Sequence, residues 1–126
     1  MLKNKSWFTF VPATIWCVLI IVGSFIPSSN VPKIAVSDKG IHFAFYAILA
    51  LLIALPLRTN TKTTNSFVSV FVAVLVIGFS LGAVIELVQH YYITGRFGEY
   101  LDLLANTTGL VAGLLVSEII KRKVVL

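Results

Sequence analysis

Charged residues are scarce in this chain. Only 12% of its 126 residues are Asp, Glu, Lys or Arg, while 58% are apolar. A soluble domain has about 25% charged residues and roughly 45–50% apolar residues, so this chain carries about half of the charge that a soluble surface needs. The shortage argues against intrinsic disorder, a nucleic-acid-binding module and a soluble enzyme. The composition instead predicts a single integral membrane domain that covers residues 1–126.

Cysteine and acidic residues are also rare. Cys17 is the only cysteine, so no disulfide can form within the chain and the cysteine count indicates no redox compartment. Five Asp and Glu residues stand against ten Lys and Arg residues, which gives a formal net charge of +5. In a membrane protein the positive-inside rule explains this excess, and no nucleic acid is required. Each acid needs a reason for its position, because an ionisable group in hydrocarbon costs at least about 2.5–3.5 kcal/mol.

Long apolar segments make up most of the chain. A membrane crossing takes roughly 20 apolar residues, so the length accommodates four crossings with short loops. The segments predict transmembrane helices over residues 7–26, 38–57, 67–93 and 101–120. The first segment is longer than the apolar region of a signal peptide and no small-residue cleavage site follows it, so we expect an uncleaved helix. The expected fold class is all-α, an integral membrane four-helix bundle.

Lys and Arg are distributed unequally among the tails and loops. Seven fall in the two tails and the second loop, and three fall in the first and third loops. The seven are Lys3, Lys5, Arg58, Lys62, Lys121, Arg122 and Lys123, and the three are Lys33, Lys39 and Arg96. Because cytoplasmic loops collect Lys and Arg, both termini are predicted to be cytoplasmic. Four of the five acids then map to the outer end of the helices, and Glu118 maps to the basic inner end.

Polar residues gather near the predicted outer end of the second, third and fourth helices. Glu86, Gln89 and His90 are spaced by three and four residues, which predicts that they share one helix face. Polar residues near the start of the second and fourth helices, such as His42 with Tyr46 and Asp102 with Asn106, are also spaced by four residues. The residues expected to form one outward-facing polar pocket are Asp38, Lys39, His42, Tyr46, Glu86, Gln89, Arg96, Glu99, Asp102 and Asn106.

Three of these residues are candidates for acid–base chemistry. His42 can exchange a proton near neutral pH, with Glu86 or Asp102 orienting its ring. Lys39 and Arg96 are suited to hold a phosphate or carboxylate group, Arg through a bidentate fork. The chain contains no H-E-x-x-H or G-x-S-x-G motif. Enzymatic activity therefore stays open at the level of sequence.

Each of these features also has a structural interpretation. The motifs Gly78-x-x-x-Gly82 and Gly109-x-x-x-Gly113 predict close helix packing. Asp38 also fits a helix cap, and the polar cluster as a whole could serve only to hold helices together. The tyrosines that are typical of an interfacial belt are Tyr91, Tyr92 and Tyr100.

A divalent metal ion is a further alternative for the polar residues. The residues with suitable oxygen or imidazole ligands are Asp38, His42, Glu86, Glu99 and Asp102. Their spacing defines no metal cage, so a cofactor stays unknown at this level. A transporter or channel is disfavoured, because the chain has no inverted repeat.

Two separate blocks of the chain resemble the VanZ-like membrane proteins. Residues 37–46, SDKGIHFAFY, resemble the D-K-x-x-H-F-x-x-Y signature of that family. The second block combines E-x-x-Q from Glu86, R-x-x-E-x-x-D from Arg96 and N-x-x-G-x-x-x-G from Asn106. The resemblance extends from about the first helix to the end of the fourth. It implies a small multi-pass protein of the bacterial cell membrane, of a type associated with resistance to the glycopeptide teicoplanin.

The resemblance and the polar pocket together lead to an expected function. We expect the pocket to bind, and potentially modify, the headgroup of a cell-envelope lipid or cell-wall precursor, with no nucleic acid as a partner. The alternative is a non-catalytic membrane module or partner subunit, in which the same polar residues only hold the helices together. The oligomeric state stays open.

Overall fold

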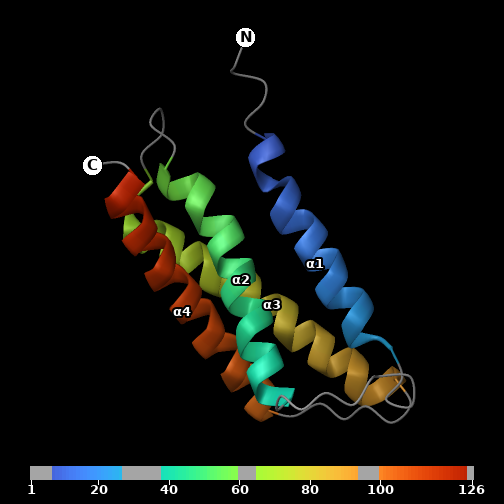
Figure 1. Ribbon diagram of the computed structural model, residues 1–126. Helices are drawn as coiled ribbons and strands as arrows, with labels where there is room; N and C mark the ends of the chain where they lie inside the picture. Colours follow the sequence, from blue (N-terminus) through green and yellow to red (C-terminus); the bar gives the residue numbers. More distant parts are fainter. Residues whose placement is uncertain (1–6, 27–37, 60–64, 94–99, 125–126) are drawn as a thin grey trace.

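The computed structural model describes residues 7–26, 38–59, 65–93 and 100–124. Within these ranges the chain forms four helices: α1 (Val11–Ser24), α2 (Asp38–Thr59), α3 (Phe67–Tyr92) and α4 (Tyr100–Val124) (Figure 1). The four spans that are long and apolar enough to cross a membrane are Trp7–Ser24, Lys39–Thr59, Phe67–Tyr92 and Tyr100–Lys123. The predicted all-α class and the four predicted helices are confirmed.

The helices alternate in direction along the bundle. The start of α1 and the end of α4 lie at the same end, together with the end of α2 and the start of α3 (Figure 1). α2 and α4 form the most extensive contact between helices, and α3 packs against both. α1 makes smaller contacts with α2 and α3, and none with α4 among the described residues. The bundle therefore consists of three closely packed helices and one loosely attached helix.

The helix ends differ from the predicted ones by a few residues. Residues 7–10 form a 3₁₀ turn before α1, and Pro12 lies in the first turn of α1, where a missing amide hydrogen bond matters least. α2 extends beyond residue 57, so Arg58, which was predicted in a loop, lies in its last turn. α4 continues to Val124, and its last turn carries three cations that favour a helix C-terminus.

Small residues set the close approach of α2 and α4. A Cβ atom at Gly109 would overlap the backbone carbonyl of Phe43, and one at Gly113 would overlap that of Ala47. At Gly78 an added Cβ would lie 2.5 Å from the side chain of Leu110. Both glycine motifs are thus confirmed as packing motifs, because the absence of a side chain lets the helices touch.

An ion pair joins α2 to α4 at the end where α2 finishes. The Arg58 guanidinium donates to both carboxylate oxygens of Glu118, over 2.9 Å from Nε and 2.7 Å from Nη2, and also to the carbonyl of Asn65. Arg58 is only 7% exposed. The sequence predicted that Glu118 lies at the basic end, and the structure identifies Arg58 as its partner. This pairing explains why the helix continues through Arg58, since a buried charge needs a partner.

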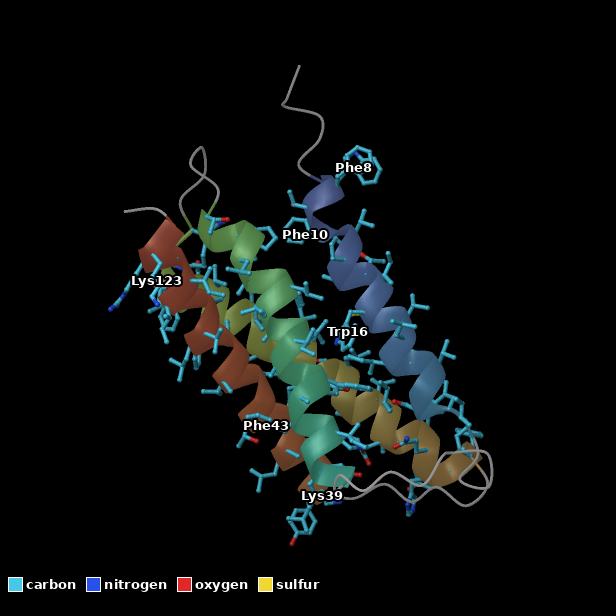
Figure 2. The ribbon with its side chains drawn as sticks, viewed as in Figure 1. Phe8, Phe10, Trp16, Lys39, Phe43 and Lys123 are labelled. Carbon is cyan, nitrogen blue, oxygen red and sulfur yellow. The ribbon has the colours of Figure 1, made fainter. Side chains whose placement is uncertain are left out.

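Hydrogen bonds at Trp16 and Ser24 attach α1 to the rest of the bundle within the described ranges. The indole of Trp16 donates to the backbone carbonyl of Phe45 over 2.9 Å, and the two rings meet edge to face. Trp16 lies on the side of α1 that faces α2 (Figure 2). The Gln89 amide donates to the carbonyl of Ser24 over 2.7 Å. The second bond satisfies one of the carbonyls left without a helical partner at the end of α1.

Candidate functional site

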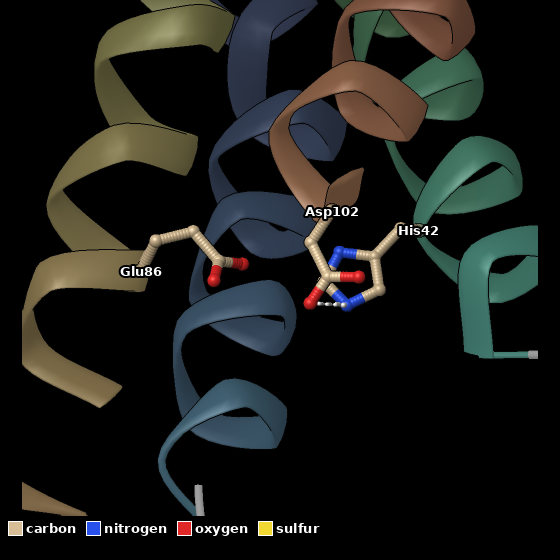
Figure 3. A group of neighbouring side chains, drawn as sticks. All are labelled: His42, Glu86 and Asp102. Atoms are coloured by element: carbon tan, nitrogen blue, oxygen red, sulfur yellow. Dashed lines mark ion pairs between the residues drawn. The ribbon is translucent and has the colours of Figure 1, made fainter. Parts of the chain in front are cut away.

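Three helices bring His42, Glu86 and Asp102 together (Figure 3). His42 comes from α2, Glu86 from α3 and Asp102 from the first turn of α4. One nitrogen or oxygen atom of each side chain lies within 4.8 Å of the corresponding atoms of the other two. Residues from positions 42, 86 and 102 of the sequence therefore meet in one cluster, near the end of the bundle at which Lys39 lies (Figure 2).

Asp102 is the centre of the charged contacts. Its Oδ1 atom accepts from Nζ of Lys39 over 2.5 Å, and its Oδ2 atom lies 3.8 Å from Nε2 of His42. Asp102 is 5% exposed, whereas the Lys39 side chain is 39% exposed. A carboxylate this deeply buried requires a compensating charge, which Lys39 supplies. Asp102 thus divides its two oxygen atoms between a lysine and a histidine.

The contact with Asn106 favours one tautomer of His42. Nδ1 of His42 lies 2.9 Å from Oδ1 of Asn106. An amide oxygen can only accept a hydrogen bond, so Nδ1 carries the proton that is donated. In the neutral ring, the lone pair then belongs to Nε2, the atom that faces Asp102. Asn106 is 1% exposed, so the contact is shielded from solvent.

Gly82 shapes the side of the cluster that α3 contributes. A Cβ atom at Gly82 would lie 2.8 Å from Nδ2 of Asn106 and 3.5 Å from the Tyr46 hydroxyl. Glu86 follows Gly82 by one helical turn and is 6% exposed, and Tyr46 is 3% exposed. The glycine was predicted only as a packing residue. Its missing side chain also provides room for two polar groups beside Glu86, a role that no sequence motif indicates.

Two polar residues of α3 lie apart from this cluster. Gln89 is buried but donates to the end of α1 rather than to the other candidate site residues in the described ranges. His90 is exposed and meets the ring of Tyr91 edge to face. His90 has the expected i, i+4 spacing from Glu86, but its side chain is exposed in the last turn of α3, whereas Glu86 and Gln89 are buried.

The remaining predicted site residues divide into two groups. Lys39, Tyr46 and Asn106 belong to the cluster as described above. The residues that lie outside the described part of the structure are Arg96, Glu99 and the side chain of Asp38. The described site is therefore built from six side chains: Lys39, His42, Tyr46, Glu86, Asp102 and Asn106. We refer to these six as the polar cluster.

The polar cluster combines three kinds of chemistry within one region, in which both carboxyl groups are buried and Lys39 reaches the surface. It holds two carboxyl groups, an imidazole with a defined tautomer and an ammonium group. Such a set can exchange protons, coordinate a cation or bind a polar headgroup. Ionisable residues within apolar segments are costly, and their usual role is functional.

Comparison with known proteins does not assign this chain to a family. No protein-family model matches it, and no curated protein and no solved structure shows a significant match. The fold and the site define a coarser class: an all-helical protein whose four helices are long and apolar enough to span a membrane, with a polar cluster buried between three of them.

Proposed function

We propose that this chain is a multi-pass protein of the bacterial cell membrane whose polar cluster binds, and potentially modifies, the headgroup of a cell-envelope lipid or cell-wall precursor. The observation that carries the proposal is the meeting of His42, Glu86 and Asp102 from three helices within 4.8 Å. The resemblance of two sequence blocks to VanZ-like proteins supports a role in resistance to teicoplanin. Teicoplanin is a glycopeptide that acts on precursors outside the membrane.

The proposed orientation places both termini in the cytoplasm and the polar cluster on the outer side. Support comes from the separation of charges along the bundle. The basic last turn of α4, marked by Lys123, and the polar cluster, marked by Lys39, lie at opposite ends (Figure 2). Positive residues favour the cytoplasmic side. Reporter fusions after the first and second helices test this: the proposal expects an outer position after α1 and an inner one after α2.

Lys39 is the group that we expect to meet the headgroup first. Its side chain is 39% exposed while its ammonium group holds Asp102. An ammonium group at a membrane surface attracts anionic headgroups, and the contribution is about 1 kcal/mol per basic residue. His42 and the two acids behind it then offer proton donors and acceptors to a bound phosphate or carboxylate group.

A susceptibility assay tests the proposed function. Cells that express the wild-type chain should tolerate more teicoplanin than cells without it, and His42→Ala, Glu86→Gln and Asp102→Asn should abolish the gain. The matched control is His90→Ala, because His90 is the only other histidine and lies exposed on α3. Equal abundance of each variant in the membrane must be verified by immunoblot. Unchanged resistance in the three site variants would show that the polar cluster is not the functional site.

A second candidate function is a purely structural role for the polar cluster. One observation favours it: the Lys39–Asp102 and His42–Asn106 contacts both bridge α2 and α4. In this case the site variants should lower the stability of the purified protein in detergent and leave teicoplanin tolerance unchanged wherever the protein still folds. The proposed function expects the opposite for Glu86→Gln, which keeps size and polarity while removing a charge.

A further inference from the structure

The ligand atoms of the polar cluster approach the spacing of a metal centre. Nε2 of His42 and Oδ2 of Asp102 are 3.8 Å apart, and the set that includes a Glu86 oxygen fits within 4.8 Å. Bonds of about 2.0–2.2 Å around a tetrahedral zinc ion place neighbouring ligand atoms about 3.4 Å apart. Small side-chain rotations close the difference, which is at most about 1.4 Å.

His42 already has the arrangement that a metal-binding histidine requires. A histidine that binds a metal usually donates its other ring N–H to an oxygen, which orients the ring and selects the tautomer. Here Nδ1 donates to Oδ1 of Asn106 over 2.9 Å. The lone pair of Nε2 is therefore directed to the side where Asp102 lies. This observation is independent of the two acids and points to a cation at Nε2.

Asp102 can bind a cation without losing its lysine partner. Oδ1 is held by Lys39, whereas Oδ2 is the oxygen that faces His42. A monodentate carboxylate uses one oxygen for the ion and leaves the other for a hydrogen-bond donor, as is common for ligating carboxylates. Lys39 then acts as a positioning residue that holds the carboxylate in place.

Charge balance favours a divalent ion that carries an anionic ligand. Glu86 and Asp102 are 6% and 5% exposed, and two carboxylates so close together repel each other. A divalent cation neutralises both. The site then has a net charge of +1, because Lys39 is positively charged, a neutral His42 adds no charge and the ion cancels the two carboxylates. One further anionic group, such as a phosphate oxygen, brings it to neutrality.

We infer that His42, Glu86 and Asp102 bind one divalent transition-metal ion of the zinc type, and that the ion completes its coordination with an anionic oxygen of the headgroup. One imidazole and two carboxylates leave an open position, as in zinc sites that bind a substrate or water. The inference rests on the proposed function in treating the polar cluster as the working site, and it names what joins the cluster to a phosphate group.

The test is a titration of the purified full-length protein with Co²⁺. This ion substitutes for Zn²⁺ in zinc sites and, unlike Zn²⁺, gives visible absorption bands when bound. The affinity tag must contain no histidine, and bound metal is first removed with a chelator. We expect saturation at one ion per chain, displacement by an equivalent of Zn²⁺, and unchanged binding in His90→Ala. His42→Ala, Glu86→Gln and Asp102→Asn should lose the saturable bands. Absence of saturable binding in the wild-type protein, or full binding in Asp102→Asn, would overturn the inference.

Asn106 provides a second variant that distinguishes a metal site from nonspecific binding. Asn106→Leu removes the acceptor of the His42 N–H and should weaken Co²⁺ binding by about 10–100-fold, the usual cost of losing such a partner. Asn106→Asp keeps an acceptor and should restore binding. Each variant is first checked for a wild-type helical spectrum. If the leucine and aspartate variants bind Co²⁺ equally well, the assigned geometry is wrong.

The metal site and the proposed function can fail separately. Co²⁺ binding without any change in teicoplanin tolerance or in the binding of phosphatidylglycerol by the purified protein in detergent would preserve the metal site and refute the proposed function. If resistance depends on the polar cluster but the purified protein binds no metal, the proposed function is supported and the metal site is refuted. If both hold, Zn²⁺ should increase the affinity of the purified protein in detergent for phosphatidylglycerol more than its affinity for zwitterionic phosphatidylcholine.

Discussion

Replacement of Gly113 by alanine should destabilise the bundle, because the added methyl group enters the contact between α2 and α4. The new Cβ would overlap the carbonyl oxygen of Ala47 and would lie 2.9 Å from Cβ of Ala50. Ordinary contact between such atoms needs about 3.5 Å, so the two helices must separate by roughly 1 Å. Overpacking of this kind costs about 1–3 kcal/mol. We expect the upper part of this range, because the obstructing atom belongs to the backbone and cannot change rotamer.

Two other glycines complete a graded series. At Gly78→Ala the nearest atoms belong to the Leu110 side chain rather than to a backbone, so we expect a smaller cost of about 1 kcal/mol. Gly23→Ala meets nothing within 4 Å and should stabilise α1 slightly, because alanine is favoured over glycine in a helix by about 1 kcal/mol. The predicted order of stability is Gly23→Ala, wild type, Gly78→Ala and Gly113→Ala.

The measurement is reversible unfolding of the purified protein in mixed micelles with a rising fraction of denaturing detergent, followed by circular dichroism. Gly23→Ala is the matched control, since it makes the same chemical change at an open position. The reasoning is refuted if Gly113→Ala lies within about 0.5 kcal/mol of the wild type, the range of ordinary surface substitutions, or if Gly78→Ala is the more damaging change.

Three further predictions concern contacts between helices. Arg58→Met should cost about 2–3 kcal/mol of unfolding free energy, less than the 3–5 kcal/mol of a fully buried pair because the Glu118 side chain is 18% exposed. The double variant with Glu118→Leu should recover most of this loss, since no charge is then left alone. Gln89→Leu should cost about 1 kcal/mol and speed amide hydrogen exchange near Ser24, because a hydrogen bond to α1 is lost. Trp16→Phe keeps a ring beside α2 but loses the N–H donor, so we expect the free energy of unfolding to fall by about 1 kcal/mol.

Each of these predictions has a result that contradicts it. Additive losses in the double variant would show that Arg58 and Glu118 do not interact energetically. Exchange rates near Ser24 that do not respond to Gln89→Leu would show that α1 is held by other contacts. Equal stability of Trp16→Phe and the wild type would assign the contribution of Trp16 to its ring alone.

The sequence determined the helices but not all of their ends. Roughly 20-residue apolar segments predict the four helices because the period and length of an apolar run are local properties. The end of α2 could not be predicted in this way. Arg58 resembles a loop residue until Glu118, 60 positions away, is seen to satisfy its charge inside the bundle.

Part of the polar cluster could also be predicted. His42, Glu86 and Asp102 are unusual within or beside apolar segments, so the cost of burying them marked them as candidates. Their meeting was expected only on the condition that the second, third and fourth helices pack together. Gln89 is likewise a polar residue within an apolar segment, yet it contacts the end of α1 instead of the polar cluster. A shared face on one helix does not specify which neighbouring helix that face meets.

By itself, the sequence determined the class of this protein: scarce charge and long apolar segments define an all-helical chain able to span a membrane. Only the tertiary structure decided the partners. Lys39 with Asp102, His42 with Asn106 and Gln89 with Ser24 are separated by 63, 64 and 65 positions in the chain. A shift of one helix by a single turn, about 5.4 Å, would change each pair in which that helix takes part while leaving the hydrophobic pattern satisfied. The glycine contacts between α2 and α4 select one register, and that register determines the site.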